Sequence, residues 1–534
     1  MTKAIRRGDA AGKASVTSDI DDTTDRPWWE TRWFVAAMIL LAFVPLLYPP
    51  VPPLVDLLGH MGRYRVELDL ARSPDLQRYF DFEWQLIGNL GVDLLIVPLA
   101  KIFGLELSVK LIAMTIPPLT VAGFLWVARE VHHRLPPTAA LALPFAFSHP
   151  FLFGFLNYTL SMALAFLAFG LWLRLGRLGR IGLRALLFVP ISFIIFICHT
   201  FGWGTLGLLC FSAEAVRQHD KGISWWKAGL KAATHALVLA APALIMLTWR
   251  SEISGAPTFG WFNWPIKSLW LVWALRDRWQ SIDTAILTWI GLAALFALVT
   301  RYFTLSRNLA FSALVLAIAF VVLPWTVFGS AYADMRLAPY ALAVIALAIR
   351  ARREPPPGLP QMLAVAATGL FAAKVAVTTV SLRIASDRQD RQFAALDHVR
   401  RGAPLVYLVG QSCDTLWPLF RQSHLGAMAI VRRHAFANDQ WGIEGANLLT
   451  VHYAPAGRFR ADPSQMVSDA GCRTRRTPTV DEAMKAIPRD AFDYVWLIDV
   501  PPYEPTSLAG YRRVWSGEGS SLYAIERDRA NKGP

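Results

Sequence analysis

The sequence is poor in charged residues and in cysteine for its length. Asp, Glu, Lys and Arg make up only 17% of the 534 residues, whereas 54% are hydrophobic and the mean hydropathy is +0.37. This balance excludes a soluble multidomain protein, which would carry more charge on its surface. The four cysteines are too few for a disulfide framework. We therefore predict an α-helical polytopic membrane protein.

Motifs that would indicate other chemistry are also missing. The polar C-terminal tail has no glycine-rich phosphate loop and no metal-ligand spacing, so we assign it no chemical role. No internal repeat is evident, which counts against the paired halves found in many transporters. The first apolar run, at 33–49, has no small-residue cleavage site and therefore indicates an uncleaved membrane anchor.

What the sequence has instead is a series of long apolar runs. A helix needs about 20 apolar residues to cross the hydrocarbon core of a bilayer, and several of these runs are shorter than that. We expect about 11 transmembrane helices, at 33–49, 107–128, 137–153, 155–173, 185–199, 200–216, 230–248, 284–300, 309–328, 337–350 and 361–381.

Basic residues decide the orientation of these helices. The net charge of +14 would suggest a nucleic-acid partner in a soluble protein. Here Lys and Arg cluster in short segments between apolar runs, which indicates cytoplasmic loops and no nucleic acid. Five basic segments all fall inside if residues 89–104 form an amphipathic helix on the outer surface. These segments are 129–134, 173–184, 217–222, 301–307 and 350–354. The N-terminus is then cytoplasmic, and residues 50–106 form a large first periplasmic loop of a bacterial inner membrane protein.

The remaining segments define three domains. Residues 1–30 are polar and without periodicity, which predicts a disordered cytoplasmic tail, and 31–382 form the transmembrane domain. Residues 383–534 predict a periplasmic α/β domain, with strands at 404–410, 427–431, 494–500 and 521–527 and a helix at 479–487. In that oxidising compartment Cys413 and Cys472 can pair, but the sequence leaves their pairing open.

The first loop carries the best candidate site residues. Asp56 and His60 stand four apart, so on a helix both point to one face. They are either a general base with a neighbour that binds or orients substrate, or a helix N-terminal carboxylate with a solvated histidine. Asp81 and Glu83 alternate with aromatic residues, a pattern typical of a sugar or cation site and also of an amphipathic loop that packs on lipid. His149 and His199, near outer helix ends, are expected to be hydrogen-bonded structural residues.

Three segments of the membrane part resemble the GT-C class of membrane glycosyltransferases. The likeness is to bacterial relatives of protein O-mannosyltransferases and of lipid A aminoarabinose transferases, and it covers about 1–381. It differs in having Asp-x-x-x-His where those enzymes have adjacent acids, and no Lys-Pro-Pro or His-Pro-Pro precedes the surface helix. The segments that carry the resemblance are VDLLGH (55–60), FDFEW (80–84) and PLAKIFGLELSVKLI (98–112).

The resemblance implies a sugar donor linked to a polyprenyl phosphate and a glycan, lipid or protein acceptor, beside membrane lipids. Asp56, the first acid after the first span, would be the general base of an inverting transfer. Arg336 would hold the donor phosphate, although it can equally be a snorkelling arginine paired with Asp334. Asp81 and Glu83 would orient the acceptor or hold a divalent cation. We predict no metal site and no firm cofactor.

Two other classes of function remain alternatives. A transporter or flippase of a lipid-linked or small solute would need ionisable residues inside the spans, and Lys374 is the main example here. A membrane-anchored binding protein would explain the tail but leave the acidic first loop without a purpose.

Overall fold

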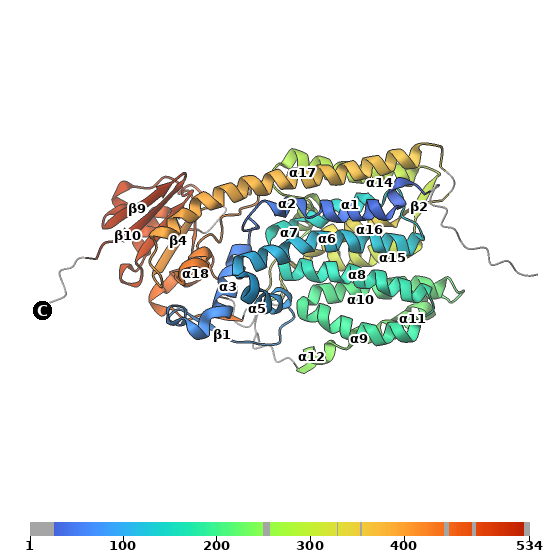
Figure 1. Ribbon diagram of the computed structural model, residues 1–534, viewed down its shortest axis with the longest axis horizontal. Coiled ribbons are helices and arrows are strands. Elements are labelled where there is room, and N and C mark those ends of the chain that lie inside the picture. The colour runs from blue at the N-terminus through green and yellow to red at the C-terminus, as the bar shows by residue number, and fades with distance from the viewer. Residues whose placement is uncertain are drawn as a thin grey trace, which may run out of the picture.

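The chain forms a helical body with a sheet-containing domain at one end of its long axis (Figure 1). We describe it from a computed structural model, which covers residues 26–248, 257–327, 329–352, 355–442, 448–472 and 477–527. Most of the predicted N-terminal tail lies outside the described residues, and Trp28–Glu30 form a short 3-10 helix.

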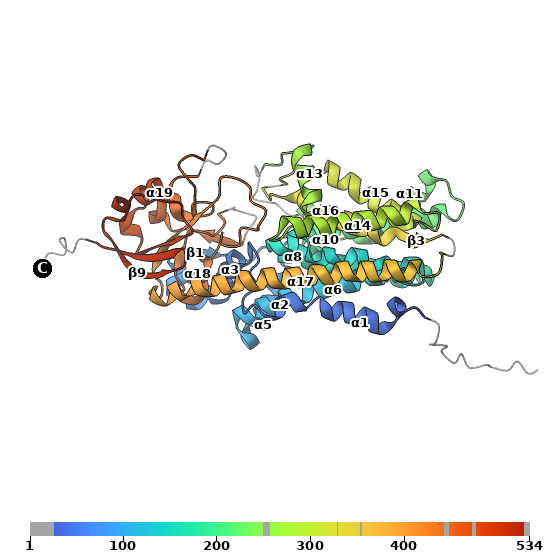
Figure 2. The same ribbon diagram turned by 90° about the horizontal axis from the view of Figure 1, so that it is seen from above.

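Long helices run side by side along the body (Figures 1 and 2). Within the described residues, five helices are long and apolar enough to cross a membrane: α6 (Leu105–His132), α8 (Leu156–Arg177), α9 (Ile181–Cys198), α14 (Gln280–Val299) and α17 (Leu359–Phe393) with the turn that follows it. The other helices of the body are α1 (Arg32–Leu41), α2 (Val44–Leu47), α7 (His149–Phe153), α10 (Thr200–His219), α11 (Trp225–Ala236), α12 (Ala243–Thr248), α13 (Trp264–Val272), α15 (Arg307–Val322) and α16 (Ala333–Ala348).

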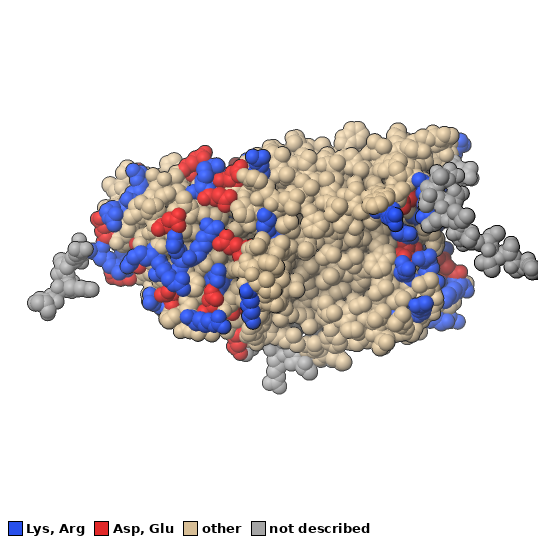
Figure 3. Space-filling model, in the orientation of Figure 1, with Lys and Arg blue, Asp and Glu red and all other residues tan. Residues whose placement is uncertain are grey.

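Charge is absent from the middle of the visible face of this body. In Figure 3, Lys, Arg, Asp and Glu gather at the two ends, and a broad band between them carries other residues. Exposed apolar side chains on this body include Leu186, Ile194 and Trp289. Such a surface matches a hydrocarbon slab and supports the predicted multi-pass membrane protein.

The predicted surface helix is present and does not continue into the next span. Helix α5 (Gly91–Phe103) has 13 residues, or about 20 Å, which is too short to cross a bilayer. Gly104, with φ of 74°, separates it from α6. Leu94, Leu95 and Ile102 are exposed on one face, whereas Ile96 is buried. Helix α5 therefore exposes apolar side chains on one face, as a helix at a membrane surface would, and buries its other face.

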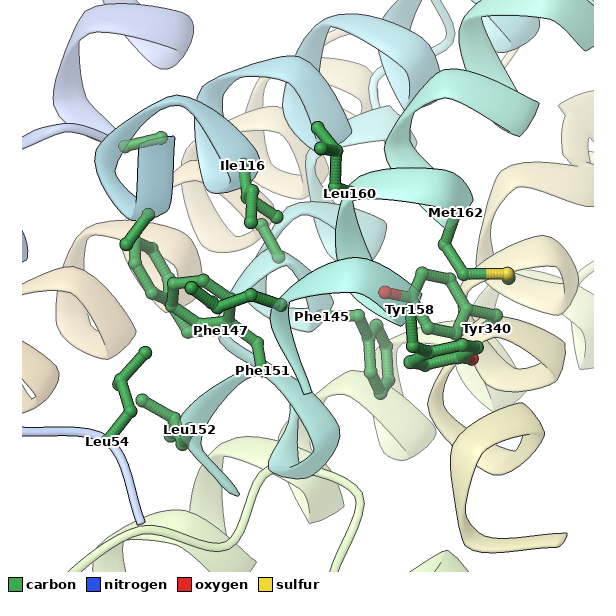
Figure 4. Packing of buried hydrophobic residues seen from close by; sticks show 14 of the residues in the cluster. Leu54, Ile116, Phe145, Phe147, Phe151, Leu152, Tyr158, Leu160, Met162 and Tyr340 are labelled. Atoms are coloured by element: carbon green, nitrogen blue, oxygen red, sulfur yellow. The ribbon is translucent and has the colours of Figure 1, made fainter. Parts of the chain in front are cut away.

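The core of the body is apolar and rich in aromatic rings. Phe145 and Phe147 come from the 3-10 helix Ala139–Phe147, and Phe151 comes from α7. Phe147 packs beside Phe151, and Phe145 lies between this pair and the rings of Tyr158 and Tyr340 (Figure 4). The predicted span 137–153 is therefore two short buried helices, divided near Ser148, in place of one long helix. The predicted span 230–248 is likewise divided, between α11 and α12.

The C-terminal part contains a mixed sheet in the order β5-β4-β8-β10-β9, with β7 paired to β4. Strand β4 is parallel to its neighbours β5, β7 and β8, whereas β8, β10 and β9 are antiparallel. The elements of this part are β4 (Pro404–Gly410), α18 (Ala427–Arg433), β5 (Phe436–Ala437), β6 (Leu449–Val451), β7 (Met466–Val467), α19 (Val480–Ala486), β8 (Tyr494–Ile498), β9 (Tyr511–Gly517) and β10 (Ser520–Ile525).

In the C-terminal domain, one predicted strand is a helix, and the two cysteines whose pairing the sequence left open form a disulfide. The predicted strand 427–431 is wrong, because Ala427–Arg433 form helix α18. Cys413 and Cys472 form a disulfide with their Cα atoms 5.3 Å apart. It joins two loops that are separated by 59 residues in the sequence.

The first loop packs against the C-terminal domain. It contains α3 (Leu57–Asp69), α4 (Pro74–Gln77) and β1 (Phe80–Phe82), and β1 pairs with β6 in a separate two-stranded sheet. Tyr79 and Phe80 are buried in one cluster with Phe436 of the domain. Helix α17 also continues from the membrane body into this end, past the predicted domain boundary at 383 (Figure 2). A second two-stranded sheet, β2 (Phe303–Leu305) with β3 (Ile349–Ala351), lies at the far end of the body.

Candidate functional site

A cavity of about 340 Å³ lies where the first loop, the membrane helices and the C-terminal domain meet. Three of the five predicted site residues, Asp56, His60 and Arg336, line it. The other lining residues are Tyr64, Asn89, Phe155, Leu156, Asn157, Tyr158, His199, Gly329, Ser330, Ala331, Tyr332, Trp441 and Asp462.

Asp56 stands at the N-terminus of α3, one turn before His60. Its backbone N–H donates a 2.8 Å hydrogen bond to the carbonyl of Phe153, which ties the first loop to α7. Gly154 makes this contact possible, because its φ of 101° suits glycine and a Cβ there would lie 2.9 Å from the Asp56 nitrogen. The backbone of α7 thus sets the position of the Asp56 carboxylate.

The charges around Asp56 oppose one another. Burial and the nearby carboxylate of Asp462 raise the pKa of Asp56 well above its ordinary value, and the guanidinium of Arg336 acts in the opposite direction. His424 Nε2 lies 3.9 Å from Asp56 Oδ1. A carboxylate with a raised pKa is a stronger base than a solvated one, as a proton acceptor in catalysis needs to be.

His60 packs against a tryptophan from the C-terminal domain. The ring centres of His60 and Trp441 are 4.8 Å apart, and the ring centre of His424 lies 4.5 Å from that of Trp441. Gly59 permits the contact, since a Cβ there would lie 2.6 Å from the Trp441 ring. Burial, followed by Arg63 and His424, lowers the pKa of His60 well below its ordinary value, so His60 is neutral at pH 7.

Arg336 is buried at the start of α16 with its guanidinium among aromatic rings. Its Cζ lies 4.7 Å from the ring centre of Phe155 and 5.4 Å from that of Phe201. One guanidinium nitrogen donates to Ser330 Oγ at 3.2 Å, and among the described residues no hydrogen-bond acceptor reaches Nε. This leaves donor capacity for an anion in the cavity.

The alternative pairing of Arg336 with Asp334 does not occur. Asp334 is fully buried and binds Lys267 Nζ at 3.1 Å and Trp270 Nε1 at 3.0 Å. Within the part of the chain that the structure describes, Arg336 has no ion pair within 4.0 Å. Asp56 is the carboxylate whose charge acts on Arg336. The arginine therefore faces the cavity and does not serve as the counter-ion of a neighbour.

A buried ion pair links the helices that carry the cavity lining. Arg63 of α3 binds Asp93 of α5 at 2.7 Å, and both side chains are buried. Asn157 Nδ2 donates to Asp93 at 3.0 Å, while Asn157 Oδ1 accepts from the Val92 N–H at 2.5 Å. Asp93 thus joins α3, α5 and α8 and is not part of the cavity lining.

Asp81 and Glu83 do not line this cavity. They lie on and just after β1, and Asp81 binds His452 at 2.8 Å while 72% of its side chain is exposed. The Glu83 N–H donates to the Leu448 carbonyl at 2.9 Å. The alternation predicted for this stretch is present, with Phe80 buried and Asp81 exposed. The structure does not bring these two acids to Asp56.

Sequence reasoning missed the two residues that the C-terminal domain contributes, Trp441 and Asp462. Each lies in an irregular segment far from Asp56 in sequence, and no motif surrounds either one. His199 was expected to be structural, and its Nδ1 does accept a 3.1 Å hydrogen bond from the Phe201 N–H while the residue lines the cavity. His149 differs from expectation, because among the described residues neither ring nitrogen has a hydrogen-bond partner.

The described residues contain no group of three or more His, Cys, Asp or Glu side chains that could hold a metal ion. These residues therefore provide no set of ligands for the divalent cation considered above. Chemically, the cavity brings together two carboxylates, the neutral His60 and the buried guanidinium of Arg336.

Comparison with known proteins identifies the fold. No family model matches the chain, and no curated protein matches its sequence. Two solved structures match over nearly the whole chain, both of ArnT from Cupriavidus metallidurans, one in the apo state and one bound to undecaprenyl phosphate. Each has a TM-score of 0.50 and covers 92% of this chain and 97% of its own, with 13% and 12% identity.

The chain has the ArnT fold. The predicted GT-C-like architecture with a C-terminal sheet domain is thereby confirmed. At 12–13% identity the likeness to ArnT extends to the fold alone. Function must be argued from the cavity.

Proposed function

We propose that the chain is a membrane glycosyltransferase that moves a sugar from a polyprenyl-phosphate donor to a glycan, lipid or protein acceptor. The observation that carries this proposal is the shared cavity of Asp56 and Arg336, a base and a phosphate-binding group. It is supported by the fold shared with an ArnT that binds undecaprenyl phosphate. By the charge bias of the loops, the cavity opens on the periplasmic side of the bacterial inner membrane.

In the proposed reaction, the acceptor hydroxyl attacks the anomeric carbon of the donor sugar. The bond between that carbon and the phosphate oxygen breaks, and polyprenyl phosphate leaves with the bonding electrons. Asp56 accepts the hydroxyl proton, and its raised pKa suits this role. Arg336 stabilises the charge that develops on the departing phosphate. Direct displacement inverts the anomeric configuration.

The neutral His60 and the ring of Trp441 form the wall next to Asp56. An aromatic ring beside hydrogen-bonding groups is a suitable surface for the apolar face of a sugar. We propose that His60 binds the substrate by hydrogen bonding, because a histidine with a lowered pKa carries no charge for a phosphate. Asp81 and Glu83 lie outside the cavity, and we propose that they help to orient the acceptor.

The test is transfer of radiolabelled sugar by the purified full chain, with a total polyprenyl-phosphate donor fraction and membrane lipid acceptors. We expect label to move into an acceptor with the opposite anomeric configuration. No transfer with any donor would contradict the proposal and favour transport or binding, and a product that retains the donor configuration would contradict direct displacement.

A further inference from the structure

A second and larger cavity, of about 610 Å³, lies at the opposite end of the helical body from the C-terminal domain. Its lining comes from the ends of α6, α8 and α10, from the starts of α9 and α15, and from β3. The charged side chains that gather at this end are visible in Figure 3. None of its lining residues belongs to the site around Asp56.

The lining of this far-end cavity has an excess of positive charge. Five arginines face three carboxylates, a net charge of +2. The arginines come from five separate elements rather than from one basic loop. The charged lining residues are Arg177, Arg184, Arg217, Arg307 and Arg350 with Glu130, Glu214 and Asp220.

Each buried carboxylate is shared between two arginines. Glu214 binds Arg184 at 3.1 Å and Arg217 at 2.6 Å. Glu130 binds Arg177 at 2.6 Å and lies 3.7 Å from Arg174. One negative charge therefore holds two positive charges at each site, and the second positive charge is left without a full counter-ion.

Arg184 is held in place before any ligand binds. Its side chain is only 2% exposed, and its Cζ lies 3.9 Å from the ring centre of Trp172. Gly176 leaves room for it, because a Cβ there would lie 3.1 Å from its terminal nitrogen. A guanidinium fixed in this way loses little side-chain entropy when it binds an anion.

Arg350 has no counter-ion within the part of the chain that the structure describes. It is exposed on β3 and lines the cavity together with Arg307, at the start of α15. Arg307 pairs with the half-exposed Asp220 at 2.6 Å, a contact that water screens. Positive groups that only set topology would extend separately into water, whereas these converge on one hollow.

We propose that this cavity binds a phosphate-bearing anion, held by Arg350 and by the lining arginines Arg177, Arg184 and Arg217. Guanidinium groups bind phosphate oxygens in a bidentate way, and a cavity of about 610 Å³ is large enough for a headgroup. The source is either an anionic lipid of the adjacent leaflet or a soluble phosphate.

The experiment is a titration of the delipidated full chain in neutral detergent, followed by its thermal unfolding. The probes are phosphatidylglycerol, zwitterionic phosphatidylcholine and inorganic diphosphate. We expect saturable stabilisation by phosphatidylglycerol or by diphosphate and none by phosphatidylcholine. Stabilisation by diphosphate identifies a soluble anion as sufficient, and stabilisation by phosphatidylglycerol alone identifies a lipid.

The matched variants are Arg350→Gln and Arg180→Gln. Arg350 has no described ion pair to lose, and Arg180 is exposed at the same end outside the cavity. Arg350→Gln should raise the Kd of the anion about tenfold, because a charge-assisted hydrogen bond is lost, whereas Arg180→Gln should leave it unchanged. Absence of binding by both anionic probes, or equal Kd values for Arg350→Gln and wild type, would overturn the proposal.

Discussion

Asp56 is the residue on which the chemistry of the proposed reaction depends, and its neighbours should control its titration. Asp462 raises the pKa of Asp56 and Arg336 lowers it. If Asp56 must be ionised to accept a proton, kcat/KM increases with pH through its pKa. Asp462→Asn should therefore move this acid limb to lower pH, and Arg336→Gln should move it to higher pH.

The measurement is the pH profile of kcat/KM for sugar transfer by each variant. Asp469→Asn removes the same charge from an exposed position outside the cavity and serves as the control. Arg336→Gln should also reduce the rate about 10²-fold or more, because one donor to the leaving phosphate is lost. Shifts of both variants in one direction would contradict these roles.

Gly154 should control the position of Asp56. Alanine at Gly154 would have to adopt a φ of 101° and place a Cβ 2.9 Å from the Asp56 nitrogen. We expect Gly154→Ala to displace Asp56 and lower the rate of transfer at least tenfold while the protein still folds. Gly204→Ala, where a Cβ meets open space, is the control. Transfer rates that are equal for Gly154→Ala and Gly204→Ala would contradict the positioning role, as measured beside their melting temperatures.

Asp439, in the C-terminal domain, gives a pH dependence of stability. Burial raises its pKa from an ordinary 3.8 to about 7. The folded state therefore binds a proton more tightly than the unfolded chain, and this contribution is fully present below pH 3.8 and is lost as pH rises to about 7. In Asp439→Asn this part of the pH dependence should vanish. The test compares melting temperatures of wild type and variant at pH 5 and pH 7.5, and an equal fall in both would contradict the shifted pKa.

At the scale of elements, the disulfide between Cys413 and Cys472 should stabilise the C-terminal domain. Closing a loop of this length lowers the entropy of the unfolded chain and contributes about 4 kcal/mol to the free energy of unfolding. We expect the Cys413→Ser/Cys472→Ser variant to unfold at lower denaturant concentration than wild type. Reductant should destabilise wild type to the same level and leave the variant unchanged. A wild type that is insensitive to reductant would contradict this expectation.

The elements also show what can be predicted from sequence and what cannot. Helix α5 was predictable because its apolar face, its length and the basic loops all agree. Helix α18 was taken for a strand, since a run of five apolar residues has no period that separates strand from buried helix. Asp56 was identified because it is the first acid after the first span, where the GT-C resemblance implies a base, and Arg336 because a guanidinium at the outer end of a span can hold phosphate oxygens. Asp81 was expected to orient the acceptor or hold a cation, and the pairing of β1 with β6 places it outside the cavity of Asp56.

Asp462 and Trp441 could not be found from sequence for a different reason. Polar residues are common in the tail, and their contact with the first loop depends on how the domain docks on α3. The Gln440 side chain donates to the Gly59 carbonyl at 3.2 Å, and Trp441 packs over the same glycine. Such contacts between distant segments leave no periodic signal in either segment.

At the scale of the whole molecule, the membrane body separates two chemical environments. The cavity with Asp56 and the C-terminal domain lie at one end, and the arginine-rich cavity lies at the other. The charge bias of the loops predicts that the first end is periplasmic and the second cytoplasmic.

Single cysteines at the two ends test this orientation. The described native cysteines give little background, because Cys198 and Cys210 are buried and the other two form the disulfide. In cells whose outer membrane has been removed, a membrane-impermeant maleimide reaches only the periplasmic face of the inner membrane. It should label Glu518→Cys in these intact cells, and Arg180→Cys only after the cells are lysed. Both residues are exposed. Labelling of Arg180→Cys before lysis would invert the topology.

The central claim is that Asp56 is the base of a sugar transfer. Its most direct test compares Asp56→Asn with wild type and with Asp81→Asn, the same change in the same loop but outside the cavity. With melting temperatures equal to wild type, we expect Asp56→Asn to lower the rate of transfer by about 10² to 10⁴-fold and Asp81→Asn to retain most of it. Wild-type rates in Asp56→Asn, or a loss confined to Asp81→Asn, would contradict the claim.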